Sequence, residues 1–516
     1  MEQTSSTASD DQRKADHLCV LVHGLWGNPQ HLSFLASSLR EKYSESELHI
    51  LVAKRNSGSF TYDGIELGGE RVTQEIEDTL ESLARDGQVI KKLSIVGYSL
   101  GGLVARYAIG LLHSKGWFEK ITPVNFTTFA SPHLGVRTPL LGFHNHLWNV
   151  LGARTLSMSG RQLFTIDSFR NTGRPLLSIL ADPDSIFIHA LAKFQRRTLY
   201  ANVVNDRSAV YYTTGISKID PFADLKAVKV NYVKGYEPII VDPDHPVSPQ
   251  DQQELPTFYK KVAGGSQTLA LRLLLLLLIP LGSILFLINS AIQSIRSQQR
   301  IRLHEEGKAG IGIESYRMGL MVEDIQSAVE GVFEDLNNSQ SQEYLPAGSE
   351  EVATSGQDST RSASGRHQPT VKSHGSHKKA PLKASAPPKR GTDSSEKSEK
   401  SSDSEVINTP VSTTTDSPTS SSSSSSDDDD DDDNDDVPAL QKVASHHHHL
   451  DFPTLALAPQ QFSMIQSLDR VGFRKYPVYI HQVSHSHAAI IVRMPRRKFE
   501  EGKVVIRHWL EEEFLI

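Results

Sequence analysis

A serine between two glycines, at the point where an apolar strand meets a helix, most constrains how this chain can fold. Residues 93–96 form an apolar run short enough for a buried strand, and a G-x-S-x-G motif follows with Ser99 as its serine. Residues 102–112 then show the apolar spacing of a helix. A serine on such a turn needs a strained backbone, and glycines at Gly97 and Gly101 remove side chains that would clash there. The motif predicts a nucleophile elbow that carries Ser99.

Short apolar runs alternate with helical patterns across residues 17–260. Strands separated by helices in this way are typical of a mostly parallel sheet that is covered by helices on both faces. The sequence therefore predicts an α/β catalytic domain over residues 17–260. The predicted strands are 18–22, 48–53, 93–96, 124–129 and 198–204, and the predicted helices are 30–42, 68–86 and 102–112.

The end of the chain, residues 450–516, again shows the patterns of regular structure. Residues 476–483 and 488–492 read as strands, and residues 504–510 as a closing helix. So short a segment buries too little surface to fold easily by itself. We expect it to complete the sheet of the N-terminal domain.

A serine nucleophile needs a base that is oriented by an acid, and on this type of fold the chain order is serine, acid, histidine. Asp206 follows the predicted strand 198–204, where a carboxylate could orient an imidazole. Asp182 and Asp184 lie in a proline-containing turn without a preceding strand, and Asp220 begins another such turn. Asp206 is the predicted acid, with the other three as rivals.

The predicted base is His487, because it closely follows the expected strand 476–483 and precedes an apolar run. His485 lies two residues away and stays open as an alternative. His481 falls within the expected strand, and His245 lies in a loop that is locked by prolines.

The developing oxyanion of an ester reaction needs two hydrogen-bond donors. The first predicted strand runs into the sequence His23-Gly24-Leu25-Trp26-Gly27, where a loop can supply one backbone N–H. The residue after the nucleophile supplies the other. We therefore expect Leu25 and Leu100 to form the oxyanion hole, and His23 to shape the loop.

Residues 136–197 form a long insertion between two predicted strands. Trp148, Phe164, Phe169 and Phe187 lie in it among leucines. Such an insertion could cap the site and bind an acyl chain, or its aromatic residues could form the core of a helical cap. Both roles can hold at once.

Residues 268–296 have a different composition, since no charged residue occurs from 273 to 295. A helix needs about 20 apolar residues to cross a hydrocarbon core. Pro280 and Gly282 near the middle could instead turn the segment back as a hairpin. Arg272 on one side, and Arg296, Arg300 and Arg302 on the other, could reach lipid headgroups at its ends. The sequence predicts a segment that contacts a membrane or lipid surface, in either geometry.

The remaining regions are expected to be a disordered leader over residues 1–16, an amphipathic helical region over 297–336 and a disordered linker over 337–449. The leader lacks the apolar core of a secretory signal. The linker is rich in serine and aspartate and cannot bury enough apolar surface to fold. Its acidic run could recruit protein partners.

The charge and the cysteine content of the chain argue against a nucleic-acid-binding protein and against a disulfide-bonded one. Nine aspartates within residues 427–436 exceed the whole net charge of −7, so the rest of the chain is nearly neutral. No basic stripe indicates a nucleic-acid partner. The single cysteine, Cys19, lies in an apolar run and reads as a core residue in a reducing, intracellular compartment.

Taken together, these motifs resemble the fungal putative serine-esterase and lipase family of α/β hydrolases. The resemblance covers residues 17–260 and the tail that contains His487. It implies that Ser99, Asp206 and His487 form a triad, that Leu25 and Leu100 form the oxyanion hole, and that the substrates are phospholipids or acylglycerols at lipid droplets and other membranes. Acyl transfer by such a triad is expected to require no cofactor. The chain departs from the lipase pattern at Tyr98, because many lipases have a histidine at this position before the nucleophile. The segments that carry the resemblance are 22–27, 97–107, 129–135 and 205–206.

The main hypothesis is a lipase or phospholipase that cleaves glycerolipid esters at a lipid droplet or endoplasmic reticulum membrane. One alternative is a membrane-tethered scaffold without catalysis, because fold alone does not establish activity. Another is an acyltransferase that uses the same nucleophile.

Overall fold

The computed structural model describes residues 14–137, 157–250, 288–289, 291–308, 316, 343–345 and 452–516. The chain divides into two units, Met1–Ser364 with His449–Ile516, and Gly365–His448, and all described residues belong to the first. The expectations for most of the leader, for Trp148, for most of segment 268–296, for most of the amphipathic region and for nearly all of the linker lie outside the described residues. Within these ranges, no helix is both long and apolar enough to span a membrane.

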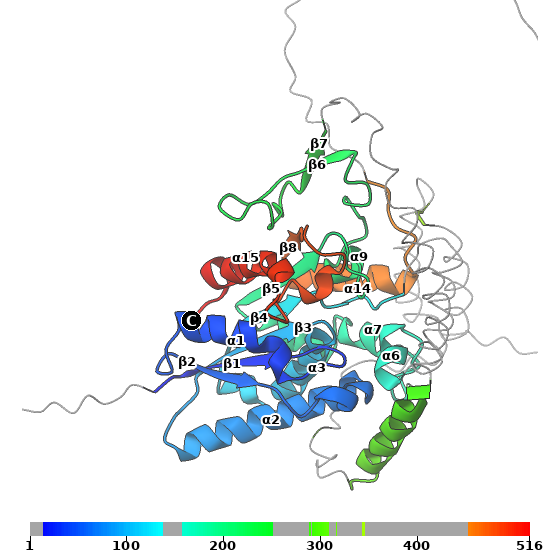
Figure 1. The fold of residues 1–516 in the computed structure, drawn as a ribbon. Helices are drawn as coiled ribbons and strands as arrows, with labels where there is room; N and C mark the ends of the chain where they lie inside the picture. The colour runs from blue at the N-terminus through cyan, green and yellow to red at the C-terminus, as the bar shows by residue number, and fades with distance from the viewer. Residues whose placement is uncertain are drawn as a thin grey trace, which may run out of the picture. The chain divides into compact units, whose positions relative to one another are not determined.

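A parallel sheet forms the centre of the described structure (Figure 1). It has six strands in the order β2-β1-β3-β4-β5-β8, and every neighbouring pair in it is parallel. The expected α/β-hydrolase architecture, a parallel sheet with helices on both faces, is confirmed. The strands are β1 (His17–Val22), β2 (Leu48–Val52), β3 (Lys92–Tyr98), β4 (Thr122–Phe129), β5 (Arg196–Asn202) and β8 (Arg474–Val478), and a separate two-stranded antiparallel sheet contains β6 (Val228–Val230) and β7 (Val247–Pro249).

Helices follow most of these strands and cover the sheet. The α-helices are α1 (Ser33–Lys42), α2 (Ile65–Arg85), α3 (Leu100–Ser114), α6 (Met158–Leu163), α7 (Leu176–Leu180), α8 (Ile186–Ala192), α9 (Tyr211–Thr214), α14 (Pro459–Val471) and α15 (Glu501–His508). The shorter turns of helix are η1 (Pro29–Leu32), η2 (Gly58–Tyr62), η3 (Trp117–Glu119), η7 (Ser486–Ala488), η8 (Arg497–Phe499) and the π-turn η9 (Trp509–Glu513).

Alternate side chains of β1 show how both faces of the sheet are buried. Leu18 and Val20 pack in a core with α2, α3 and α8, whereas Cys19 and Leu21 pack in a second core with α1 and α15. This two-sided burial explains why the strand reads as a continuous apolar run. Burial raises the pKa of the Cys19 thiol, as fits a core residue.

The C-terminal segment adds the last strand to the sheet. β8 pairs with β5 in parallel, with Tyr476 opposite Tyr200. In Figure 1 the orange and red elements α14, β8 and α15 therefore lie beside the cyan and green elements of the N-terminal half.

Two details of this segment differ from the sequence expectation. The strand expected over 476–483 ends at Val478. The expectation of a strand over 488–492 is wrong: Ser486–Ala488 is a turn of 3-10 helix, and the N–H of Val492 donates to Ala489 O in a following turn. Ala489, Ile490 and Ile491 are fully buried, and a short apolar run cannot distinguish a buried turn from a strand.

The described part of the 136–197 insertion contributes to the core. Phe164, Phe169 and Phe187 are all buried, and the Phe187 ring lies 4.9 Å from that of Tyr107 on α3. These three aromatic side chains therefore pack as core residues.

Candidate active site

Ser99 occupies a sharp turn between β3 and α3. Its backbone angles, φ 56° and ψ −127°, lie in a region that side chains rarely adopt. Gly97 and Gly101 allow this turn, because a Cβ on Gly97 would overlap the backbone of Gly102, and one on Gly101 would overlap the carbonyl of Val22. The predicted elbow thus has a specific steric basis.

The imidazole of His487 connects the serine to the acid. Its Nε2 lies 2.9 Å from Oγ of Ser99, and its Nδ1 lies 2.8 Å from Oδ2 of Asp206. The three predicted residues come from the elbow, from the loop after β5 and from η7 after β8. The structure brings all three together in hydrogen-bonding geometry.

Asp206 is held as a carboxylate by several donors. Its Oδ2 accepts a hydrogen bond from Asn202 Nδ2 at 2.9 Å, and its Oδ1 accepts from the N–H groups of Ser208 and Ala209 at 3.0 and 2.9 Å. Burial opposes ionisation, but the charge of His487 and these hydrogen bonds hold the pKa of Asp206 below its ordinary value. The ionised form is the one that can stabilise an imidazolium.

The loops that carry acid and base are joined directly. Ser486 N–H donates to Asn205 O at 3.0 Å, and Ser486 Oγ donates to Val204 O at 2.7 Å. Asn205 has a φ of 60°, which asparagine tolerates better than most residues. These contacts fix His487 opposite Asp206.

The rival histidines have other surroundings. The ring of His485 lies 6.2 Å from that of His487 and stacks on it. His481 Nδ1 lies 3.4 Å from Glu501 Oε1, and the His245 backbone carbonyl accepts from Asn231. Only His487 bridges the serine and the acid among the described histidines.

The rival acids are likewise placed elsewhere. Asp182 pairs with Arg174 at 2.6 Å, and its Oδ1 accepts from the backbone of Asp184. Asp220 accepts from Phe222 N–H, and burial raises its pKa to about 6. None of these groups contacts His487 in the described structure.

The loop after β1 passes directly against the nucleophile. A Cβ on Gly24 would come within 2.8 Å of the Ser99 Cβ, so only glycine fits there. Leu25 follows in this loop, and Leu100 is the first residue of α3, where backbone N–H groups lack helical partners. His23 is buried, and its Nδ1 bonds the carbonyl of Gly24 at 3.1 Å, as expected of a residue that shapes the loop.

Segment η2 holds this loop in place. Trp26 N–H donates to Thr61 Oγ1 at 3.0 Å, and Trp26 Nε1 donates to the Tyr62 hydroxyl at 2.6 Å. Gly58 N–H donates to Gly27 O at 2.8 Å. Thr61 and Tyr62 were not predicted from the sequence, because no motif marks side chains that hold a loop only through their hydroxyl groups.

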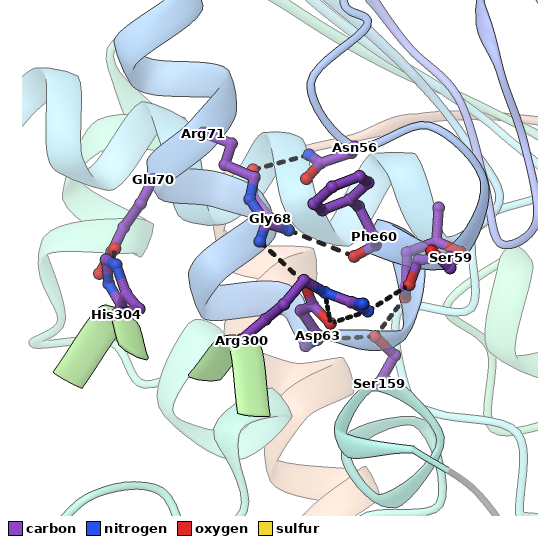
Figure 2. Close-up of polar contacts among 12 residues, drawn as sticks. Asn56, Ser59, Phe60, Asp63, Gly68, Glu70, Arg71, Ser159, Arg300 and His304 are labelled. Carbon is purple, nitrogen blue, oxygen red and sulfur yellow. Dashed lines mark hydrogen bonds and ion pairs between the residues drawn. The ribbon is translucent and has the colours of Figure 1, made fainter. Parts of the chain in front are cut away.

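A charged cluster secures η2 to a helix from a distant part of the sequence, described over residues 291–305 (Figure 2). The buried carboxylate of Asp63 accepts from Arg71 at 2.8 Å and from Arg300 at 2.6 Å. Arg300 also donates to the carbonyl oxygen of Ser59, the second residue of η2, at 2.9 Å. One turn further along its helix, His304 Nε2 lies 2.6 Å from Glu70 Oε2. The helix after the apolar segment is thus anchored beside the loop that faces the nucleophile.

Tyr98, the departure from the lipase pattern, contacts the base. Its hydroxyl donates to the backbone carbonyl of His487 at 2.9 Å, and its ring lies 5.2 Å from the imidazole. This contact was not predicted, although the unusual residue before Ser99 marked the position.

The comparison with known families concerns the part of the chain that contains Ser99 and Asp206. Residues 12–219 match the model of the family described as putative serine esterase, which confirms the resemblance. Putative lipase ROG1 of Saccharomyces cerevisiae is 31% identical over 46% of this chain and 34% of its own length. Putative lipase C4A8.10 of Schizosaccharomyces pombe is 31% identical over 39% of this chain and 26% of its own. The match spans about a third or less of each relative's length.

Solved structures show more distant similarity. Phospholipase PlaB from Legionella pneumophila is 13% identical, with a TM-score of 0.25, over 37% of this chain and 39% of that one. A lipase-esterase related protein from Clostridium acetobutylicum is 14% identical, with a TM-score of 0.22, over 39% of this chain and 80% of that one.

Proposed function

We propose that this chain, which resembles the putative serine esterases, is a serine hydrolase that cleaves carboxylic esters of glycerolipids through an acyl-enzyme on Ser99. The observation that supports the proposal most directly is the double contact of His487, with Nε2 2.9 Å from Ser99 Oγ and Nδ1 2.8 Å from Asp206 Oδ2. Nucleophile, base and orienting acid are the three parts that acyl transfer by a serine requires. A scaffold without catalysis has no need of this arrangement.

In the first step, Ser99 Oγ attacks the carbonyl carbon of the ester while its proton passes to His487 Nε2. The carbonyl oxygen becomes an oxyanion, which the N–H groups of Leu25 and Leu100 are proposed to bind. As the carbon–oxygen bond to the leaving alcohol breaks, His487 gives its proton to that alcohol. The acyl group remains on Ser99.

In the second step, His487 takes a proton from water, and the resulting hydroxide equivalent attacks the acyl carbon. The bond to Ser99 breaks, Ser99 Oγ recovers its proton from His487, and a fatty acid leaves. Asp206 stays ionised and stabilises the imidazolium in both steps. The residues of this chain supply every proton transfer.

We further propose that the enzyme works at a lipid surface, at a lipid droplet or endoplasmic reticulum membrane. The uncharged run over residues 273–295 comes shortly before Arg300 in the sequence, and Ile288, Ile292 and Ile295, its described isoleucines, are exposed. Exposed apolar side chains that continue an apolar segment are suited to lipid. Such a tether would raise the local concentration of an insoluble substrate.

The test of catalysis is labelling of the purified protein with a lipid-like fluorophosphonate, alongside release of fatty acid from mixed phospholipid and acylglycerol vesicles. We expect the wild type to be labelled and to release fatty acid, and Ser99→Ala to do neither. A folded wild-type protein that is not labelled would contradict the proposal and favour the scaffold. Adding a lysolipid acceptor separates hydrolysis from acyl transfer, since a transferase would form diacyl lipid instead of free fatty acid.

The tether is tested by deleting residues 269–295 and fractionating cells. We expect the shortened protein to leave the membrane or droplet fraction while the purified protein keeps fluorophosphonate labelling. Continued membrane association after the deletion would contradict this part of the proposal.

A further inference from the structure

A small pocket with basic walls lies next to the loop of the catalytic histidine. Its volume is about 250 Å³, and Arg493, Arg496 and Lys498 contribute cationic side chains to its lining. Ala488, which directly follows His487, also lines it. The pocket therefore begins one residue from the base that contacts the nucleophile.

The charged residues that line this pocket are all basic. No lining residue is acidic, and Nε of Arg493 is buried without a hydrogen-bond partner in the described structure. Burial lowers the pKa of His485, another lining residue, and Arg493 acts in the same direction, so His485 adds neutral donor and acceptor atoms. A buried guanidinium nitrogen without a partner, in a lining whose charged residues are all basic, indicates an anionic ligand.

The remaining walls of the pocket are apolar. Val483, Met494 and Phe499 line it together with the cations. A small inorganic anion gains little from such walls, whereas a phosphate that is attached to carbon chains would contact both parts. The composition thus fits the polar end of an amphiphile.

The position of Arg493 relates the pocket to the base. The Arg493 N–H donates to Ala488 O at 3.0 Å, which holds Arg493 beside the residue that follows His487. Arg493 also acts on the Tyr98 phenol, where it opposes the rise in pKa that burial causes. In a glycerophospholipid, only the glycerol carbons and their oxygens separate the phosphate from the acyl esters. For a substrate whose phosphate is bound here, an ester of the same molecule must meet Ser99, which contacts His487, the residue before the pocket-lining Ala488.

We propose that the pocket lined by Arg493, Arg496 and Lys498 binds the phosphate diester of a glycerophospholipid substrate. This inference rests on the proposed hydrolase function and names its substrate class. Guanidinium groups donate paired hydrogen bonds to phosphate oxygens, and lysine adds a point charge. A neutral acylglycerol has no group that uses these cations, so the pocket selects phospholipid.

The test compares three esters with the same enzyme, each soluble as a monomer: a short-chain phosphatidylcholine, a diacylglycerol with the same acyl chains, and p-nitrophenyl butyrate. The variants are Arg496→Gln, Lys498→Gln and the double substitution, because both side chains are exposed. Arg497→Gln is the matched control, since Arg497 is an exposed cation of the same segment that does not line the pocket. Monomeric substrates exclude an effect of surface charge on membrane binding.

We expect the double variant to lose about tenfold in kcat/KM for phosphatidylcholine and to keep its activity on the two neutral esters. Arg497→Gln should match the wild type on all three. An equal loss on all esters, or no loss on phosphatidylcholine, would overturn the phosphate subsite while leaving the hydrolase function intact. A wild type that cleaves none of the three esters would overturn both proposals together.

Inorganic phosphate distinguishes a substrate headgroup from a free anion. We expect it to compete with phosphatidylcholine in the wild type, and less so in the double variant. If phosphate inhibited cleavage of p-nitrophenyl butyrate while the preference for phosphatidylcholine was the same in both proteins, the pocket would be a site for free phosphate, and the proposal would be wrong.

Discussion

Nε2 of His487 lies 2.9 Å from Oγ of Ser99, although 388 residues separate them in the sequence. The contact depends on β8, which pairs with β5 and so carries the His487 loop to the sheet edge where the Asp206 loop also lies. In the sequence, residues 251–451 are thus inserted between two parts of one catalytic domain, and Arg300 and His304 of this insertion contact the first part.

Single substitutions of His487 and His485 test the triad most directly. We expect His487→Gln to lower kcat by at least about 10⁴-fold, because Ser99 loses its base. His485→Gln should stay within about tenfold of wild type, since its ring contacts His487 without reaching Ser99. The measurement is hydrolysis of p-nitrophenyl butyrate by proteins with matched unfolding midpoints. The reverse order of effects would assign the base to His485.

Tyr98 is expected to position the base through the backbone. Tyr98→Phe removes the hydroxyl that donates to the His487 carbonyl and leaves that carbonyl without this donor. We expect a loss of about 1 kcal/mol in the free energy of unfolding. A merely structural role would leave catalysis unchanged, so kcat is measured as well, and we expect it to fall several-fold with KM little altered. Equal kcat in the two proteins would show that the contact does not orient His487.

The sequence predicted the triad because its members stand at positions that topology controls. Ser99 is marked by flanking glycines, and Asp206 and His487 each follow a strand whose end must lie at the same sheet edge. Parallel strands with crossovers leave few other arrangements. The fold class followed from the same alternation of buried runs and helices.

Other features depend on contacts that no local pattern encodes. The apolar run over 488–492 is buried in turns and not in a strand, and a short buried run has the same sequence pattern in both structures. Thr61 and Tyr62 hold the loop after β1 only because the fold brings their hydroxyl groups to Trp26. Arg300 reads as a surface cation next to an apolar segment, yet its partner is a fully buried carboxylate more than 200 residues away.

Buried neutral histidines make stability depend on pH in the mildly acidic range. Burial lowers the pKa of His17 and of His508 from 6.5 to about 4, while Ser94 and Tyr200 hydroxyls bond their rings. Between these values the unfolded chain binds protons that the folded one does not, so stability falls as pH drops from about 6.5 toward 4.

The change that tests this dependence is His508→Gln, measured by urea unfolding at pH 7 and at pH 4.5. We expect the wild type to lose up to about 3 kcal/mol more than the variant between the two pH values, since each pKa unit corresponds to about 1.4 kcal/mol. Equal losses in both proteins would mean that His508 titrates normally in the folded state.

Arg300 is expected to stabilise the loop that faces the nucleophile through Asp63 and Ser59. Arg300→Gln removes one of two guanidinium partners from a carboxylate with no exposed surface, so we expect a loss of about 1–3 kcal/mol in the free energy of unfolding. Because η2 also holds Trp26, kcat for p-nitrophenyl butyrate should fall as well. Arg302→Gln is the control: Arg302 lies on the same helix and pairs with Glu306 at the surface, where solvent screens the pair, so its substitution should leave the urea unfolding midpoint unchanged. If the two variants unfolded alike, the ion pair with Asp63 would contribute nothing to holding the helix, and the proposed link between the apolar segment and the active-site loop would lose its support.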